Sequence, residues 1–99
     1  MTDFFCKLFG PRPTFVMDMS PEERAIMQQH GAYWKQGLQR GNVVVFGLVM
    51  DPTEAYGMGV LRFDTEAEAR SFCDGDPTIK SSQGFRIDMF PMPMGAVNS

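Results

Sequence analysis

The stretch VVVFGLVM at residues 43–50 decides the fold of this 99-residue chain. It is rich in β-branched residues and too short for a helix, so it predicts a strand. The turn signal DPTE at 51–54 separates it from a second apolar stretch at 56–63, and the pair predicts a β-hairpin. Strand alternation makes both sides of the first strand apolar, with Val43, Val45 and Val49 on one side and Val44, Phe46 and Leu48 on the other.

Two helices are expected outside the hairpin, and each begins with a capping box. SPEE at residues 20–23 combines an N-cap serine, a proline suited to the first helical position and a closing glutamate. The helix that it opens extends to about Arg40, where Gly41 ends it. TEAE at 65–68 opens the second helix, which ends near Asp74.

Strands at residues 4–9 and 85–90 complete the pattern. The order strand, helix, strand, strand, helix, strand predicts an α+β, ferredoxin-like βαββαβ fold. Right-handed crossovers then place the four strands in one antiparallel sheet with the two helices on one face. Because the 43–50 strand is apolar on both sides, the other face also needs cover. We expect a homodimer in which the sheets of two copies pack face to face.

The composition excludes several classes of function. With 43% hydrophobic and 21% charged residues, the chain is expected to be a single globular domain over residues 1–99. A net charge of −3 and the lack of clustered Lys and Arg disfavour a nucleic-acid partner. No apolar run reaches the ~20 residues of a membrane span, and the opening MTD lacks the basic start of a secretory signal. We expect a cytoplasmic protein with no membrane partner.

Neither a metal site nor a nucleotide site is signalled by the sequence. One histidine, two separated cysteines and no CxxC pair form no recognisable set of metal ligands. The glycines within the hairpin do not form a GxGxxG loop, so no nucleotide cofactor is expected. Cys6 and Cys73 lie in unrelated contexts, and we expect both to be reduced thiols.

The single histidine is the first candidate for chemistry. His30 lies on the apolar stripe of the first helix, where a buried imidazole needs a partner for its ring N–H. Asp76, directly after the second helix, is a candidate partner because the two helices of this fold lie side by side. The alternatives are that His30 is an ordinary core-edge residue and that Asp76, before Pro77, only stops a helix.

Four further residues are candidates for contact with a ligand. Arg12, between two prolines, presents either a planar fork to a carboxylate or a solvated loop charge. Tyr33 and Trp34 flank the histidine and form either a binding platform or part of the core. Gly47 lies inside a strand, which is typical of a bulge or of a close approach by backbone or ligand.

An ordered set of motifs over about residues 4–92 resembles the YCII-related (YciI-like) domain family. The set comprises the apolar first strand, Arg12-Pro13, SPEE at 20–23, His30, Tyr33-Trp34, Gly41, Gly47-Leu48-Val49 and Asp76-Pro77. The resemblance implies a ferredoxin-like unit that pairs into a dimeric α+β barrel, with His30 and Asp76 as a catalytic dyad. One branch of the family is similar to a dehydrochlorinase of aromatic degradation. Leu48 departs from the proline that the family often has there, which adds bulk to a pocket wall.

Two functions follow from these residues. The first is a cofactor-independent lyase, isomerase or dehydrochlorinase in which His30 is the general acid or base and Asp76 orients it. Arg12 or backbone donors would then hold developing negative charge. The second is a non-catalytic homodimer that binds a small molecule, with the dyad as a buried polar pair; haem binding through His30 is a third. A partly polar cavity open beside His30 favours the enzyme, and a filled, dry surround favours the second function.

Overall fold

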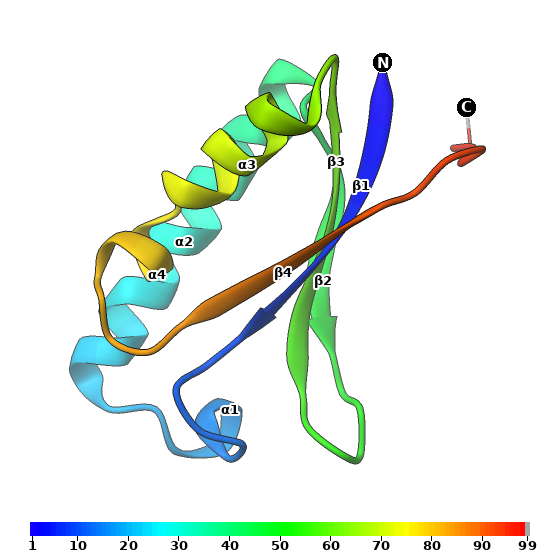
Figure 1. Ribbon diagram of the computed structural model, residues 1–99. Helices are drawn as coiled ribbons and strands as arrows, with labels where there is room; N and C mark the ends of the chain where they lie inside the picture. The colour runs from blue at the N-terminus through cyan, green and yellow to red at the C-terminus, as the bar shows by residue number, and fades with distance from the viewer. Residues whose placement is uncertain (99) are drawn as a thin grey trace.

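The computed structural model describes residues 1–98, and its main elements follow one another in the order that the sequence predicts (Figure 1). Two short helices, α1 and α4, are added to that order. The elements are β1 (Thr2–Phe9), α1 (Phe15–Asp18), α2 (Pro21–Arg40), β2 (Val43–Val49), β3 (Tyr56–Phe63), α3 (Glu66–Asp74), α4 (Pro77–Lys80) and β4 (Arg86–Pro91).

The strands form one antiparallel sheet in the order β2-β3-β1-β4. Figure 1 shows α2 and α3 side by side on one face of this sheet. The predicted ferredoxin-like α+β fold is confirmed, because two crossing βαβ units bring β1 and β3 to the centre and leave β2 and β4 at the edges.

The long helix α2 begins and ends at the predicted signals. The Ser20 hydroxyl accepts a hydrogen bond from the Glu23 N–H at 3.1 Å, and the Glu23 carboxylate accepts one from the Ser20 N–H at 2.8 Å. Gly41 ends the helix with a φ of 84°, a left-handed conformation that glycine adopts without strain. Neither this 20-residue helix nor any other within residues 1–98 is long and apolar enough to cross a bilayer.

The segment after α3 does more than end a helix. The Asp76 side chain accepts a hydrogen bond from the Thr78 N–H, and Pro77 follows at the first helical position, so Asp76 is the N-cap of the short helix α4. The Asp-Pro step therefore stops one helix and starts another. This second helix start turns the chain so that Asp76 is fully buried, with no exposed surface.

A bulge in β2 corrects one expectation from the sequence. The register shifts between Val43 and Val45, so Val43 pairs with core residue Leu61 and packs on the helix-covered face. Val43 therefore shares a face with Phe46 and Leu48, whereas Val45 lies on the opposite face. The expectation that Val43 and Val45 share a side is wrong, because the extra residue reverses the alternation.

The two faces of the sheet have different side-chain rows. On the helix-covered face, one row across the strands is Phe46, Gly59, Cys6 and Met89, and the next is Leu48, Gly57, Leu8 and Ile87. On the opposite face, an apolar row of Val45, Val60, Phe5 and Phe90 crosses all four strands. Val45 and Phe90 in this row are half exposed. The open face is therefore apolar along its middle.

The core lies between α2, α3 and the sheet. Trp34 packs against Phe72 and Phe46, and its ring lies over Gly59, where an added Cβ would come within 2.3 Å of it. Gly59 is thus required for the packing of Trp34, because any side chain at this position would displace the indole. Cys6 and Cys73 are buried in the same cluster and are not bridged.

Candidate functional site

The predicted partners His30 and Asp76 meet in the buried region between α2 and α4. His30 lies on the face of α2 that points to the sheet, and its Nδ1 is 2.7 Å from Asp76 Oδ2. The histidine is 9% exposed. The hydrogen bond expected from the sequence is present, and it joins two residues that are 46 positions apart in the chain.

The Asp76 carboxylate accepts four hydrogen bonds, with donor–acceptor distances between 2.6 and 2.8 Å. Oδ2 accepts from His30 Nδ1 and, at 2.6 Å, from Trp34 Nε1. Oδ1 accepts from the Thr78 N–H and the Thr78 hydroxyl, each at 2.8 Å. Thr78 is itself fully buried. A buried charge is tolerated when it is hydrogen-bonded in this way, because the donors replace the water that it has lost.

These donors keep Asp76 ionised. Burial raises the pKa of the Asp76 carboxyl, but the hydrogen bond and charge of His30, together with the hydrogen bonds from Trp34 and Thr78, outweigh burial and hold the pKa below its ordinary value. An ionised carboxylate is only an acceptor, so His30 Nδ1 must carry the proton in their shared hydrogen bond. The other ring nitrogen, Nε2, is therefore the one that is free to gain or lose a proton.

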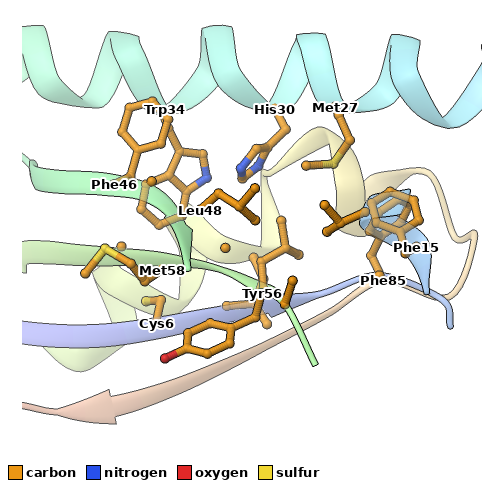
Figure 2. Close-up of a pocket in the computed structure, with 18 of the residues that line it drawn as sticks. Cys6, Phe15, Met27, His30, Trp34, Phe46, Leu48, Tyr56, Met58 and Phe85 are labelled. Carbon is orange, nitrogen blue, oxygen red and sulfur yellow. The ribbon is translucent and has the colours of Figure 1, made fainter. Parts of the chain in front are cut away.

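A cavity of about 230 Å³ opens beside His30, between α2 and the sheet (Figure 2). Figure 2 shows His30 directed from α2 toward the sheet, between Trp34 and Met27. The two rows of the helix-covered face supply the floor, and Gly57 is part of it. A Cβ at Gly57 would meet only ordinary contacts with Leu8, so the missing side chain leaves room that no core residue takes. This glycine, unlike Gly59, leaves room in the cavity.

The walls of the cavity are almost entirely apolar. They are formed by rings, thioethers and aliphatic groups from Phe15, Val16, Met19, Met27, Trp34, Phe46, Leu48, Ala55, Phe85 and Ile87, with Tyr56 and Met58 of β3 at one side. Phe15 and Phe85 meet edge to face, with their ring centroids 5.1 Å apart. Cys6 also lines the cavity, and a hydrogen bond with Cys73 together with burial raises the pKa of its thiol, which therefore stays uncharged. Among the described residues, no Lys, Arg, Asp or Glu lines this cavity.

The structure brings some of the predicted site residues together and separates others. Trp34 and Gly47 line the cavity with His30. Tyr33 does not; its hydroxyl donates to the Phe72 carbonyl at 2.8 Å and joins α2 to α3. Tyr33 thus has a structural contact in place of the ligand contact that the sequence analysis considered.

Arg12 also lies away from the cavity walls. Its guanidinium makes two hydrogen bonds of 2.9 Å to the Glu23 carboxylate and two of 2.8 Å to Asp18, one to the side chain and one to the carbonyl. These bonds fix the 10–19 loop, which carries α1, to the start of α2. The hydrogen bonds from Arg12 and Ser20 lower the pKa of Glu23 to about 2.

The sequence patterns do not mark every residue of this region as functional. Phe15 lies in the short helix α1, where no periodic pattern marks it, and Phe85 begins the strand expected at 85–90 but lies just before β4 in the structure. Thr78 could have been found, because an Asp-Pro-Thr sequence combines an N-cap, a first-turn proline and a donor two residues after the cap. Among residues 1–98, no three His, Cys, Asp or Glu side chains gather as a metal site.

The architecture defines the chain as a ferredoxin-like α+β protein. Comparisons with known proteins agree with this class. A family model for the YCII-related domain matches residues 4–93, and the chain belongs to that family. The chain is also similar to a solved structure of 5-chloro-2-hydroxyhydroquinone dehydrochlorinase (TftG) from Burkholderia phenoliruptrix AC1100 in complex with 2,5-dihydroxybenzoquinone. The TM-score is 0.52 at 13% identity, over 86% of this chain and 90% of that one, so the likeness concerns the fold. No curated protein matches the sequence.

The hydrogen bonds of Thr78 to Asp76 lead to a first prediction. Thr78→Val keeps the shape but removes the hydroxyl donor, so Asp76 Oδ1 keeps only the Thr78 backbone N–H. Loss of a hydrogen bond to a buried charge should lower the free energy of unfolding by about 1.5–3 kcal/mol, measured by urea denaturation. Thr53→Val is the matched control, because Thr53 is exposed. Equal stability losses for the two variants would contradict the anchoring role of Thr78.

The Arg12–Glu23 ion pair leads to a second prediction, on pH. The pKa of Glu23 falls from 4.5 to about 2 on folding, so the pair adds stability above pH 4.5 and loses it as the pH falls toward 2. The urea midpoint of the parent should therefore drop across this window, and the drop should be smaller in Glu23→Gln. Glu22→Gln, which removes the neighbouring carboxylate that accepts from Gln83, should keep the drop of the parent. Parallel profiles for the parent and Glu23→Gln would rule out this contribution.

Proposed function

We propose that this protein is an enzyme acting on a small molecule, in which His30 transfers protons and Asp76 orients it. The observation that carries the proposal is the 2.7 Å hydrogen bond between His30 Nδ1 and the fully buried Asp76, at the wall of an apolar cavity. Because Nδ1 holds its proton toward Asp76, Nε2 is the nitrogen that exchanges a proton with a ligand.

The proposed reaction begins with removal of a proton from carbon. Neutral His30 takes a proton from a carbon next to a carbonyl, and the C–H electron pair moves into the carbonyl to give an enolate. The imidazolium that forms is stabilised by the Asp76 carboxylate behind it. If the proton returns to a different carbon, the result is an isomerisation. If a neighbouring group departs with its bonding electron pair, the result is an elimination, and neither route needs a cofactor.

The solved structure with a similar fold suggests which reaction to test first. TftG is a dehydrochlorinase in complex with 2,5-dihydroxybenzoquinone. Elimination from a small ring compound is therefore the first reaction type to examine, with isomerisation as the next. The cavity of about 230 Å³ agrees in scale with such a compound, because an apolar cavity of roughly 150 Å³ already holds benzene.

A second candidate function is binding without catalysis. The Asp76 carboxylate caps α4 and anchors Trp34, so it would be retained for stability alone. The apolar walls also favour this function over one that needs several polar groups. In that case the protein is a homodimer that binds or senses a small molecule through the same cavity.

We further propose that two copies pair through the open faces of their sheets, in the cytoplasm. The apolar row of Val45, Val60, Phe5 and Phe90 crosses this face, and its ends are half exposed. A continuous apolar stripe flanked by charged residues such as Lys7 and Asp88 suits an isologous interface, in which the same patch meets itself.

The dimer leads to a third prediction. The parent should scatter light at micromolar concentration as a particle of twice 11.1 kDa. Phe90→Glu places a charge in the apolar row, and its desolvation cost should shift the population to monomer. Leu38→Glu is the control, because Leu38 is exposed on α2, away from the open face of the sheet, and this variant should remain a dimer. A folded, monomeric parent would refute the pairing.

The catalytic role leads to a fourth prediction. In deuterium oxide, the parent should exchange protons next to the carbonyl of a member of a panel of small uncharged cyclic ketones, enones and lactones, followed by proton NMR. The exchange rate of His30→Gln should be about 10²–10⁴-fold lower than that of the parent, which is the usual contribution of a general base. Asp76→Asn should also lose rate, because an amide NH₂ can force the other His30 tautomer.

The matched control for this experiment is Lys35→Gln, an exposed change on the same helix, which should exchange at the parent rate. Exchange by His30→Gln at the parent rate would sink the catalytic proposal. Binding of panel members with no exchange by the parent would select the second candidate function.

A further inference from the structure

The charges around the cavity indicate the class of its ligand better than the shape of the cavity does. His30 is the one basic side chain on the walls among residues 1–98, and the carboxylate of Asp76 lies directly behind it. The pair is neutral when His30 is protonated and carries one negative charge when it is not. A ligand in the cavity therefore meets no net positive charge in either state.

The neighbouring cations are engaged elsewhere. Arg12 donates four hydrogen bonds to Glu23 and Asp18, so these N–H groups are not available to a ligand. Lys7 lies over the Tyr56 ring at 5.0 Å, and Arg86 over the Phe9 ring at 4.5 Å; both come from the open face of the sheet. None of these groups can reach a ligand without giving up a contact.

An anionic ligand would therefore lose its water without gaining a counter-charge. Moving a carboxylate into apolar surroundings costs far more than moving an uncharged amide of the same shape. The aromatic and thioether groups of the walls, by contrast, make favourable contacts with an apolar ligand in any orientation. His30 Nε2 is the one ring nitrogen left for a ligand oxygen: it accepts from a hydroxyl when the imidazole is neutral and donates to a carbonyl oxygen only when the imidazole is protonated.

We propose that the cavity selects an uncharged, mainly apolar molecule with one hydrogen-bonding oxygen for His30, and that it excludes carboxylates. This inference rests on the proposed function only in placing the substrate in this cavity. It assigns the substrate class that the dyad acts on: neutral ketones, lactones or phenols, and not the carboxylic acids that a free Arg12 would have attracted.

Binding can be read at the site itself, because Trp34 is the single tryptophan of the chain and lines the cavity. Fluorescence titrations at pH 7 would compare 4-methylbenzamide and 4-methylphenol with 4-methylbenzoate. The amide and the carboxylate have nearly the same shape and differ in charge. We expect the two neutral probes to quench Trp34 fluorescence, and 4-methylbenzoate to bind at least about tenfold more weakly than the amide.

A charge placed at the cavity mouth should reverse this preference. Leu48 lines the cavity from the edge strand β2 and is 56% exposed, so a lysine there can be solvated without disturbing the fold (Figure 2). Leu48→Lys should strengthen 4-methylbenzoate binding by about tenfold and leave the amide within about twofold. Leu48→Gln, polar but uncharged, and Leu38→Lys, the same charge on α2 outside the cavity, should both keep the parent preference.

Each outcome decides the proposal. Equal binding of the amide and the carboxylate by the parent overturns it, as does the failure of all three probes to quench Trp34 at millimolar concentration. An unchanged carboxylate affinity in Leu48→Lys also overturns it, because the missing cation would then not be the cause. Neutral preference without proton exchange would uphold the substrate class and reject catalysis, whereas exchange on a carboxylate substrate would do the reverse.

Discussion

The Asp76 carboxylate is the interaction on which the rest of the structure depends. It is fully buried, and its hydrogen bonds come from α2 through His30 and Trp34 and from α4 through Thr78. Removing any donor leaves part of a buried charge unpaired, which costs far more than the bond itself adds. The same bonds keep the carboxylate ionised, and the ionised carboxylate fixes which nitrogen of His30 carries the proton in their hydrogen bond. Stability and the chemistry of the site are thus set by one group.

The sequence predicts the fold well because its signals are local. The two capping boxes and Gly41 delimit the helices, and the apolar hairpin at 43–63 can pair in few other ways. It also indicates the His30–Asp76 pair, since a lone histidine on a buried stripe needs a partner at the end of the neighbouring helix. The bulge at Val44 is not predicted, because an inserted residue leaves no mark on a stretch that is apolar at every position.

The role of Arg12 depends on contacts that only the folded chain supplies. From the sequence, a stiff loop with one arginine offers a free fork to a ligand. In the structure, the Arg12 guanidinium donates two hydrogen bonds to the Glu23 carboxylate and another to the Asp18 side chain. The same Glu23 carboxylate also closes the capping box of α2. The sequence marks Glu23 as part of a cap but cannot show that one carboxylate serves two partners. Because Arg12 is held there, no Lys or Arg within residues 1–98 lines the cavity, and the loop bearing Phe15 is fixed at its edge.

Trp34 limits how the cavity can vary. It donates to Asp76, forms a wall beside His30, and rests on Gly59, where no side chain fits. A change at Trp34 would therefore alter the wall, the carboxylate and the core at once. Leu48, on the opposite side of the cavity, belongs to an edge strand, is half exposed and touches none of the dyad's hydrogen bonds. Because one carboxylate ties together most of the site, this edge is where the lining of the cavity can change without loss of stability.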